Sequence, residues 1–221
     1  MTAIVLDIEG TTSSTESVHV GLYAYARPRL GPYLEAHREE PAVRAVLAEI
    51  GAATTEEAVK ALHAWMDGDV KATPLKTLQG RIWAEGFAAG ELTSHFFPDV
   101  PPALRAWHAA GHRLAVFSSG SVASQRPWFA HSPYGDLSAL VGDWFDTVNA
   151  GPKREAGSYA RIAAALGGPG APLFLSDVPA ELDAAAAAGW RTAGVRRPGE
   201  PNATAPFGPH PVIATFEEID L

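Results

Sequence analysis

The sequence predicts an α/β fold, a doubly wound parallel sheet with an inserted helical cap subdomain. Short apolar runs alternate with helical patterns along most of the 221 residues, and this alternation is typical of a parallel sheet covered by crossover helices. A long helical stretch separates the first strand from the second, which indicates an insertion. We expect a core domain of residues 1–14 and 96–221 and a helical cap of residues 15–95.

The first predicted strand covers residues 3–6. These residues are all apolar, as expected for a strand that is covered on both faces of a parallel sheet. Asp7 and Glu9 follow at its carboxyl end, where open α/β sheets bind their ligands, and Gly10 allows the backbone to turn. Asp7 is therefore a candidate nucleophile that accepts a phosphoryl group beside a divalent cation. The alternative is an acidic strand end that only caps a turn.

The insertion begins with a helix near Val18, for which the polar residues 12–17 offer N-caps. The apolar residues that follow have helical spacing, and we expect interruptions at Pro28 and at Gly31-Pro32. Three more helices of the insertion are predicted over residues 42–50, from residue 54 onward, and over residues 75–92.

The remaining core elements alternate between strand and helix. Strands are predicted over residues 113–117, 144–148, 173–176, 192–195 and 212–214. Helices are predicted over residues 101–110, 124–131, 158–166 and 179–188. Gly111 suits the end of the first of these helices, and Pro179 suits the first position of the last. A loop rich in proline and glycine covers residues 198–211.

Further polar groups follow the later strands. Ser118 and Ser119 come directly after one strand and Asp177 directly after another, while Lys153 stands near a helix start. A helix N-terminus disfavours cations, so an anionic partner would explain the position of Lys153. Together with Asp7, hydroxyls, an ammonium and a second carboxylate at one rim suit phosphoryl transfer. Taken singly, each has a structural alternative: a turn, a surface lysine, or a carboxylate that complements a helix N-terminus.

Composition limits the remaining function classes. The chain is 47% hydrophobic with a net charge of −8 and no cysteine, so it can bury a sizeable core but offers no basic surface for nucleic acid. The lack of cysteine excludes disulfides and fits a reducing compartment. The first apolar run is too short for a secretory signal or a membrane span. We expect a cytoplasmic monomer with a small-molecule partner and no contact with nucleic acid or membranes.

These motifs resemble the haloacid-dehalogenase-like (HAD-like) superfamily, whose core is Rossmann-like. The chain is more closely similar to the enolase-phosphatase (acireductone synthase) family of methionine salvage. The segments that carry this closer resemblance, spread over nearly the whole chain, are residues 7–12, 75–80, 96–100, 151–153, 158–159 and 174–178.

The resemblance implies a magnesium-dependent phosphatase with one Mg²⁺ per subunit. Such an enzyme enolises the phosphorylated diketone 2,3-diketo-5-methylthiopentyl 1-phosphate and hydrolyses its phosphate through a phospho-aspartate, which leaves an acireductone. Asp7 would be the nucleophile and Glu9 the general acid, and Asp7, Glu9 and Asp177 would bind the metal. Ser118 and Ser119 would contact the substrate, and Lys153 would contact its phosphate.

Several alternatives stay open beside this interpretation. The chain could be another HAD-like small-molecule phosphatase or a dehalogenase-like hydrolase, although Glu9 and Asp177 argue against a metal-free dehalogenase. A phospho-accepting regulatory module should be shorter and would need no cap. The enolisation base is not assigned, and Glu181 has no defined role. Trp83 and Phe87 are candidates for a methylthio pocket under a mobile cap, with core packing as their alternative.

Overall fold

The computed structural model describes residues 2–68, 70, 72–168 and 170–221. The chain forms two compact units, one made of Met1–Val18 and Thr93–Leu221 and the other of His19–Leu92. The cap boundaries expected at residues 15 and 95 lie close to the limits of the second unit, and the role of a cap stays a prediction. Among the described residues we find no helix with the length and apolar character needed to cross a membrane.

The larger unit is built on a six-stranded sheet in the order β3-β2-β1-β4-β5-β6, in which every neighbouring pair is parallel. The strands are β1 (Ala3–Leu6), β2 (Arg113–Phe117), β3 (Asp143–Phe145), β4 (Leu173–Ser176), β5 (Arg191–Val195) and β6 (Val212–Ile213). The chain winds outward from β1 first to one side and later to the other. The parallel doubly wound sheet predicted from the sequence is thus confirmed, with its topological switch between β1 and β4. In such sheets the ligand crevice lies at the switch, beyond the carboxyl ends of the strands.

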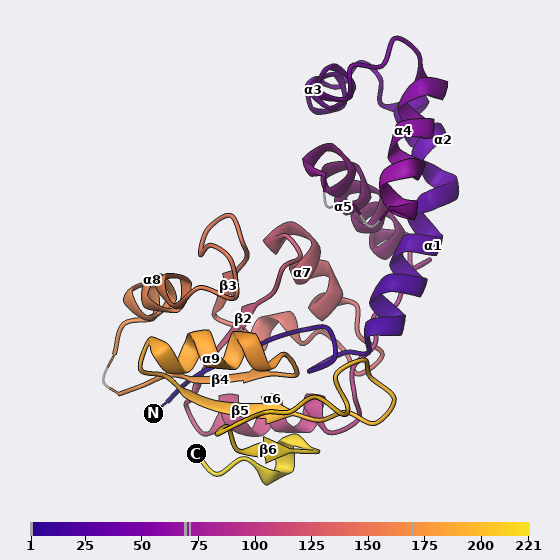
Figure 1. Cartoon of the computed structure of the whole chain (residues 1–221). Coiled ribbons are helices and arrows are strands. Elements are labelled where there is room, and N and C mark those ends of the chain that lie inside the picture. The colour runs from indigo at the N-terminus through magenta and orange to yellow at the C-terminus, as the bar shows by residue number, and fades with distance from the viewer. Residues whose placement is uncertain (1, 69, 71, 169) are drawn as a thin grey trace. The chain divides into compact units, whose positions relative to one another are not determined.

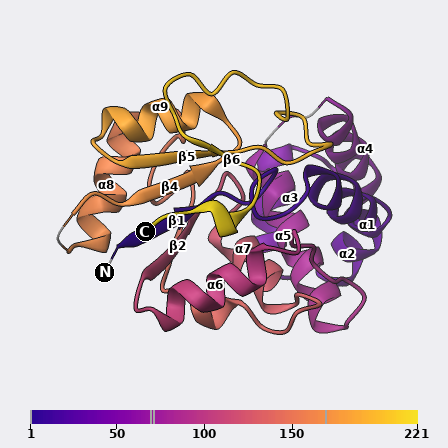
Figure 2. The ribbon, with the colours of Figure 1, turned by 90° about the horizontal axis from the view of Figure 1, so that it is seen from below.

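Helices cover both faces of this sheet (Figures 1 and 2). They are α6 (Val100–Ala109), α7 (Val122–Ala130), α8 (Ala156–Leu166) and α9 (Pro179–Ala187). Figure 2 shows α8 and α9 together on one side and α6 on the other. Under α8, the fully buried ring of Tyr159 lies edge-on to Phe117 and Phe174, with ring centroids 5.5 and 5.2 Å apart. This aromatic core fixes α8 against β2 and β4. Short 3₁₀ helices complete the unit, η3 (Ser138–Leu140) and η4 (Phe216–Glu218).

The smaller unit is helical and has its own apolar core, formed around Leu30, Leu34, Leu62 and Leu78. The π-helix η1 (Ser17–Leu22) spans the boundary between the two units. The elements of the smaller unit are α1 (Tyr23–Ala26), the 3₁₀ helix η2 (Arg27–Arg29), α2 (Leu30–Ala36), α3 (Pro41–Ile50), α4 (Thr55–Asp67) and α5 (Thr73–Ala88). Most of the apolar residues of α2, α3, α4 and α5 therefore pack into one core.

The two aromatic residues proposed for a substrate pocket lie on α5. Phe87 is buried, and the indole Nε1–H of Trp83, which is half-buried, donates to the carbonyl oxygen of Leu22 at 2.8 Å. Trp83 thus has a contact inside the helical unit. A role in a methylthio pocket stays a prediction.

Several predicted boundaries differ from the structure, each for a local reason. The helix predicted to end at residue 92 ends at Ala88, and Gly90 then adopts a φ of 72°, which favours glycine and stops the helix. The interruption expected at Gly31-Pro32 is wrong, because α2 runs through both residues. Pro32 stands in the first turn, where a missing N–H costs no helical hydrogen bond.

Two predicted element boundaries next to the site also differ from those in the structure. The third strand ends at Phe145 and does not reach residue 148, because the Asp146 carboxylate accepts hydrogen bonds from the backbone N–H groups of Val148 and Asn149 and forms a turn. Helix α7 begins at Val122, two residues before the predicted start. The hydroxyl of Ser121 caps it by accepting from the Ser124 N–H.

Candidate active site

The site residues predicted from the sequence meet at the carboxyl rim of the sheet. Asp7 follows β1, Ser118 follows β2 and Asp177 follows β4, while Lys153 comes from the loop between β3 and α8. They line one pocket of about 230 Å³. Its walls are Asp7, Glu9, Thr15, Ser118, Ser119, Lys153, Asp177, Val178, Glu181, Pro201 and Asn202. The fold therefore brings all six residues predicted for the site into one pocket, at the carboxyl ends of the strands and next to the switch between β1 and β4.

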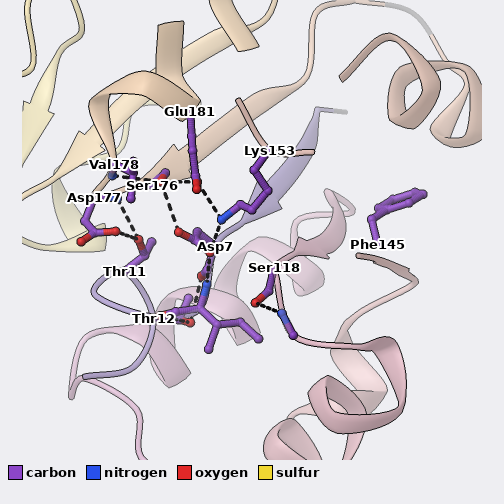
Figure 3. A network of polar contacts seen from close by, with 12 residues as sticks. Asp7, Thr11, Thr12, Ser118, Phe145, Lys153, Ser176, Asp177, Val178 and Glu181 are labelled. Atoms are coloured by element: carbon purple, nitrogen blue, oxygen red, sulfur yellow. Dashed lines mark hydrogen bonds and ion pairs between the residues drawn. The ribbon is translucent and has the colours of Figure 1, made fainter. Parts of the chain in front are cut away.

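A buried network of ion pairs and hydrogen bonds joins Asp7, Lys153, Ser176 and Glu181 (Figure 3). The ammonium Nζ of Lys153 lies 2.6 Å from Asp7 Oδ1 and 2.7 Å from Glu181 Oε2. Ser176 Oγ lies 3.2 Å from Asp7 Oδ2 and 3.0 Å from Glu181 Oε2. All four side chains are nearly inaccessible to solvent. The anionic partner that the position of Lys153 requires is thus present within the protein, as a pair of carboxylates.

The loop after β1 turns sharply to place Asp7. The carbonyl oxygen of Ile8 accepts from the N–H groups of residues 11–13, and the hydroxyl of Thr12 donates to the Asp7 carbonyl oxygen at 3.0 Å. Gly10 has a φ of 70°, and a Cβ at this position would lie 2.2 Å from Asp177 Oδ2. Only glycine permits both the conformation and this close approach. The motif therefore brings the β1 and β4 loops together.

Lys153 is held by helix α8. The phenol of Tyr159 donates to the Lys153 carbonyl oxygen at 2.7 Å, and the hydroxyl of Ser158 donates to the Pro152 carbonyl oxygen at 2.7 Å. Gly151 has a φ of 101°, and a Cβ there would lie 2.8 Å from Ser158 Oγ. The aromatic core beneath α8 is therefore connected through Tyr159 to the backbone of Lys153.

The serine motif after β2 combines a site role with a structural one. Ser118 is buried, its N–H donates to the Phe145 carbonyl oxygen at 3.2 Å, and its hydroxyl oxygen accepts from the Gly120 N–H. Ser119 is exposed. Both residues line the pocket, whereas Ser121 caps α7. The structural alternative, a turn followed by an N-cap, is therefore present in this motif. The same motif also supplies two residues of the pocket.

The pocket carries an excess of negative charge. Four acidic residues line it with one lysine. Burial raises the pKa of Asp7 to about 8, with the carboxylates of Glu181 and Asp177 adding to the rise and Lys153 opposing it. Burial likewise raises the pKa of Asp177 to about 6. Burial alone would lower the pKa of Lys153, but Asp7 and Glu181 outweigh it and hold that pKa above its usual value.

The donor set fits a magnesium ion. No group of three or more His, Cys, Asp or Glu side chains in the described part of the chain is arranged to hold a metal. Magnesium, however, usually takes only one or two carboxylates and completes its shell with water and substrate phosphate oxygens. Asp7 and Asp177 can supply those carboxylates, and the excess negative charge favours a cation. Glu9, which also lines the pocket, stays a prediction as the third ligand.

Three residues of the site have no role assigned from the sequence: Glu181 and Asn202, which line the pocket, and Ser176, which contacts Asp7. Glu181 completes the network with Lys153, and Ser176 connects it to Asp7. Ser176 is the last residue of a predicted strand, so its position offered a signal. Asn202 donates from Nδ2 to Asp177 Oδ2 at 2.9 Å. It comes from the loop rich in proline and glycine, where periodicity offers no signal.

Comparison with known proteins agrees with this geometry. A family model described as a haloacid dehalogenase-like hydrolase matches residues 1–189. The chain is 59% identical to a protein named Enolase-phosphatase E1 from Saccharopolyspora erythraea, over 99% of this chain and 95% of that protein. It is 57% identical to the protein of the same name from Nocardia farcinica, over 100% and 97% of the two chains.

Solved structures share the fold. The UTR4 protein from Saccharomyces cerevisiae is 30% identical, with a TM-score of 0.83 over 99% of each chain. CbbY from Rhodobacter sphaeroides, solved in complex with phosphate, is 18% identical, with a TM-score of 0.61 over 99% of this chain and 96% of that one. The second likeness concerns the fold alone.

Replacing Lys153 by Met should destabilise the protein by about 3–5 kcal/mol, because Asp7 and Glu181 are then left as buried acids without a cation. Urea unfolding with a chelator present measures this loss. Adding Glu181→Gln to the Lys153→Met variant should recover part of the stability, since one of the unpaired acids is removed. If Glu181→Gln instead lowers the stability of the Lys153→Met variant by as much as it lowers that of the wild type, Lys153 and Glu181 do not interact as described.

Proposed function

The chain belongs to the enolase-phosphatase E1 family of haloacid dehalogenase-like hydrolases, and on that basis we propose that it enolises 2,3-diketo-5-methylthiopentyl 1-phosphate and hydrolyses the phosphate. The products are the acireductone 1,2-dihydroxy-3-keto-5-methylthiopentene and inorganic phosphate, as in methionine salvage. One observation carries the proposal for the phosphatase step. A carboxylate and an ammonium lie 2.6 Å apart at the end of the central strand, on the wall of a pocket.

Lys153 would bind the phosphate and orient it. An ammonium has three N–H donors, and the contacts with Asp7 and Glu181 use two of them. The third can donate to a phosphate oxygen. Ser118 and Ser119 line the same pocket and would offer their hydroxyls to the phosphate. These groups would stabilise the negative charge on the equatorial oxygens during transfer. Tyr159 keeps the lysine backbone in place.

Asp7 would then attack. One carboxylate oxygen forms a bond to phosphorus while the bond between phosphorus and the enol oxygen breaks, which gives a phospho-aspartate. Glu9, two residues away on the same loop, would give its proton to the departing oxygen. In the second half, Glu9 would take a proton from a water molecule. The water oxygen bonds to phosphorus, the bond to Asp7 breaks, and both phosphate and free Asp7 result.

A bound Mg²⁺ would supply positive charge that lets an anionic carboxylate approach an anionic phosphate. Asp7 and Asp177 would hold it, with Glu9 as the proposed third ligand. The acidic character of the pocket supports this part of the proposal, because four acidic residues accompany a single lysine there. The same excess would repel a phosphate if no cation balanced it.

The proposal extends to the setting of the enzyme. The cysteine-free sequence fits a reducing compartment, and we propose a cytoplasmic monomer. The cap role of residues 15–95 belongs to the same proposal.

Replacing Asp7 by Asn should reduce phosphate release by on the order of a thousandfold or more, because an amide does not form the phospho-enzyme. The fold should persist, since Lys153 keeps its contact with Glu181. Phosphate release and circular dichroism measure the two effects. Acid quenching of the wild-type reaction followed by peptide mass spectrometry should place one phosphoryl group on Asp7. An adduct on another residue, or a variant with substantial turnover, contradicts the assignment.

Removing divalent cations should abolish phosphate release, and added Mg²⁺ should restore it, because the acidic pocket otherwise opposes phosphate binding. The measurement is the rate of phosphate release in excess chelator and after titration with magnesium chloride. The apo protein should remain folded, as judged by its thermal transition. Full activity in excess chelator would contradict the metal assignment.

A further inference from the structure

The segment after β5 returns to the carboxyl rim of the sheet, where it contacts Thr11, Thr15 and Asp177. The guanidinium Nε of Arg197 donates to the Thr11 carbonyl oxygen at 3.1 Å. Glu200 Oε2 accepts from the Thr15 N–H at 2.9 Å, and Asn202 Nδ2 donates to Asp177 Oδ2 at 2.9 Å. Residues 197–202, here named the rim segment, therefore join the loop after β1 to the loop after β4.

The base of the rim segment is firmly anchored. Arg197 is only 4% exposed, and its Nη1 lies 2.9 Å from Asp99 Oδ1. The guanidinium carbon lies 4.5 Å from the ring centroid of Phe97 and 5.1 Å from that of Phe216. The Arg197 guanidinium is therefore held by a buried ion pair and by contacts with two aromatic rings. The segment that carries Asn202 thus starts from a fixed point.

Asn202 holds one oxygen of Asp177. The hydroxyl of Thr11 lies 3.4 Å from Oδ1 of that carboxylate, a long contact, and Gly10 packs against it. The contact from Asn202 to Oδ2 is much shorter. Because a carboxylate only accepts hydrogen bonds, the amide must present its nitrogen to it. Of these two side-chain contacts to the Asp177 carboxylate, the hydrogen bond from Asn202 is therefore the stronger restraint.

We propose that Asn202 is a positioning residue that orients the Asp177 carboxylate for a divalent cation and thereby sets the affinity of the site for Mg²⁺. The inference rests on the proposed function, since it takes Asp177 as a metal ligand. Groups that hydrogen-bond to a ligating carboxylate fix its orientation, and losing one typically lowers metal affinity or activity by roughly 10–100-fold. Asn202 acts through Asp177 and takes no part in bond making or breaking.

A purely structural role for Asn202 predicts something different. Its amide would then only secure the rim segment, and its loss would lower stability without changing the affinity for Mg²⁺. The two roles are separated by measuring metal binding directly. Thr204 offers a matched control, because it is exposed two residues further along the same loop.

The test compares wild type, Asn202→Ala and Thr204→Ala in chelator-treated protein titrated with magnesium chloride. Isothermal calorimetry gives the Kd for Mg²⁺, and the rise of Tm with Mg²⁺ concentration gives an independent measure. Asn202→Ala should raise the Kd roughly tenfold, whereas Thr204→Ala should match wild type. Phosphate release, assayed alongside, should recover in Asn202→Ala when the Mg²⁺ concentration is raised.

The outcomes separate this inference from the proposed function. An Asn202→Ala variant with a lower apo Tm but the wild-type Kd overturns the positioning role and leaves the proposed function untouched. A wild-type protein that binds Mg²⁺ but releases no phosphate from the diketone phosphate contradicts the proposed function. In that case the Kd values for Mg²⁺ still test whether Asn202 positions Asp177. A wild-type protein that binds no Mg²⁺ overturns the inference, because there is then no metal ion to position.

Discussion

The contact between Lys153 and Asp7 is the interaction on which the site depends. The two groups lie 2.6 Å apart and are almost inaccessible to solvent. An isolated buried carboxylate would stay protonated and would be a poor nucleophile. Lys153 offsets part of that cost, and Glu181 and Ser176 complete the network around it. Because acidic groups still outnumber the lysine, the site as built favours a further cation.

The fold serves this interaction by fixing three loops at the point where the sheet changes direction. Gly10 brings the loop of Asp7 against Asp177, and Tyr159 connects the aromatic core under α8 to the backbone of Lys153. On the far side, Arg197 fixes the segment that leads to Asn202. Asp7, Lys153 and Asp177 each thus contact a partner that is itself buried. This arrangement is what a reaction that depends on positioning requires.

Much of the core could be predicted because its signals are local. Strands such as β1 and β4 are covered on both faces, so they are continuous apolar runs. Asp7 and Asp177 directly follow these strands, which is why they were found, and Lys153 stands out because a cation near a helix start needs an anion. Asn202 could not be found this way. Its loop has no periodicity, and its contact with Asp177 exists only after β5 returns the chain to the rim.

The most direct test of the central claim, that this network acts on a diketone phosphate, is the kcat/KM for phosphate release from 2,3-diketo-5-methylthiopentyl 1-phosphate beside a panel of sugar phosphates. We expect the diketone phosphate to be preferred by roughly a hundredfold or more, since a site built for one substrate's polar groups rejects others, with the acireductone as the second product. A sugar phosphate hydrolysed equally well would indicate another phosphatase of the same superfamily. Release from none of them would contradict the account.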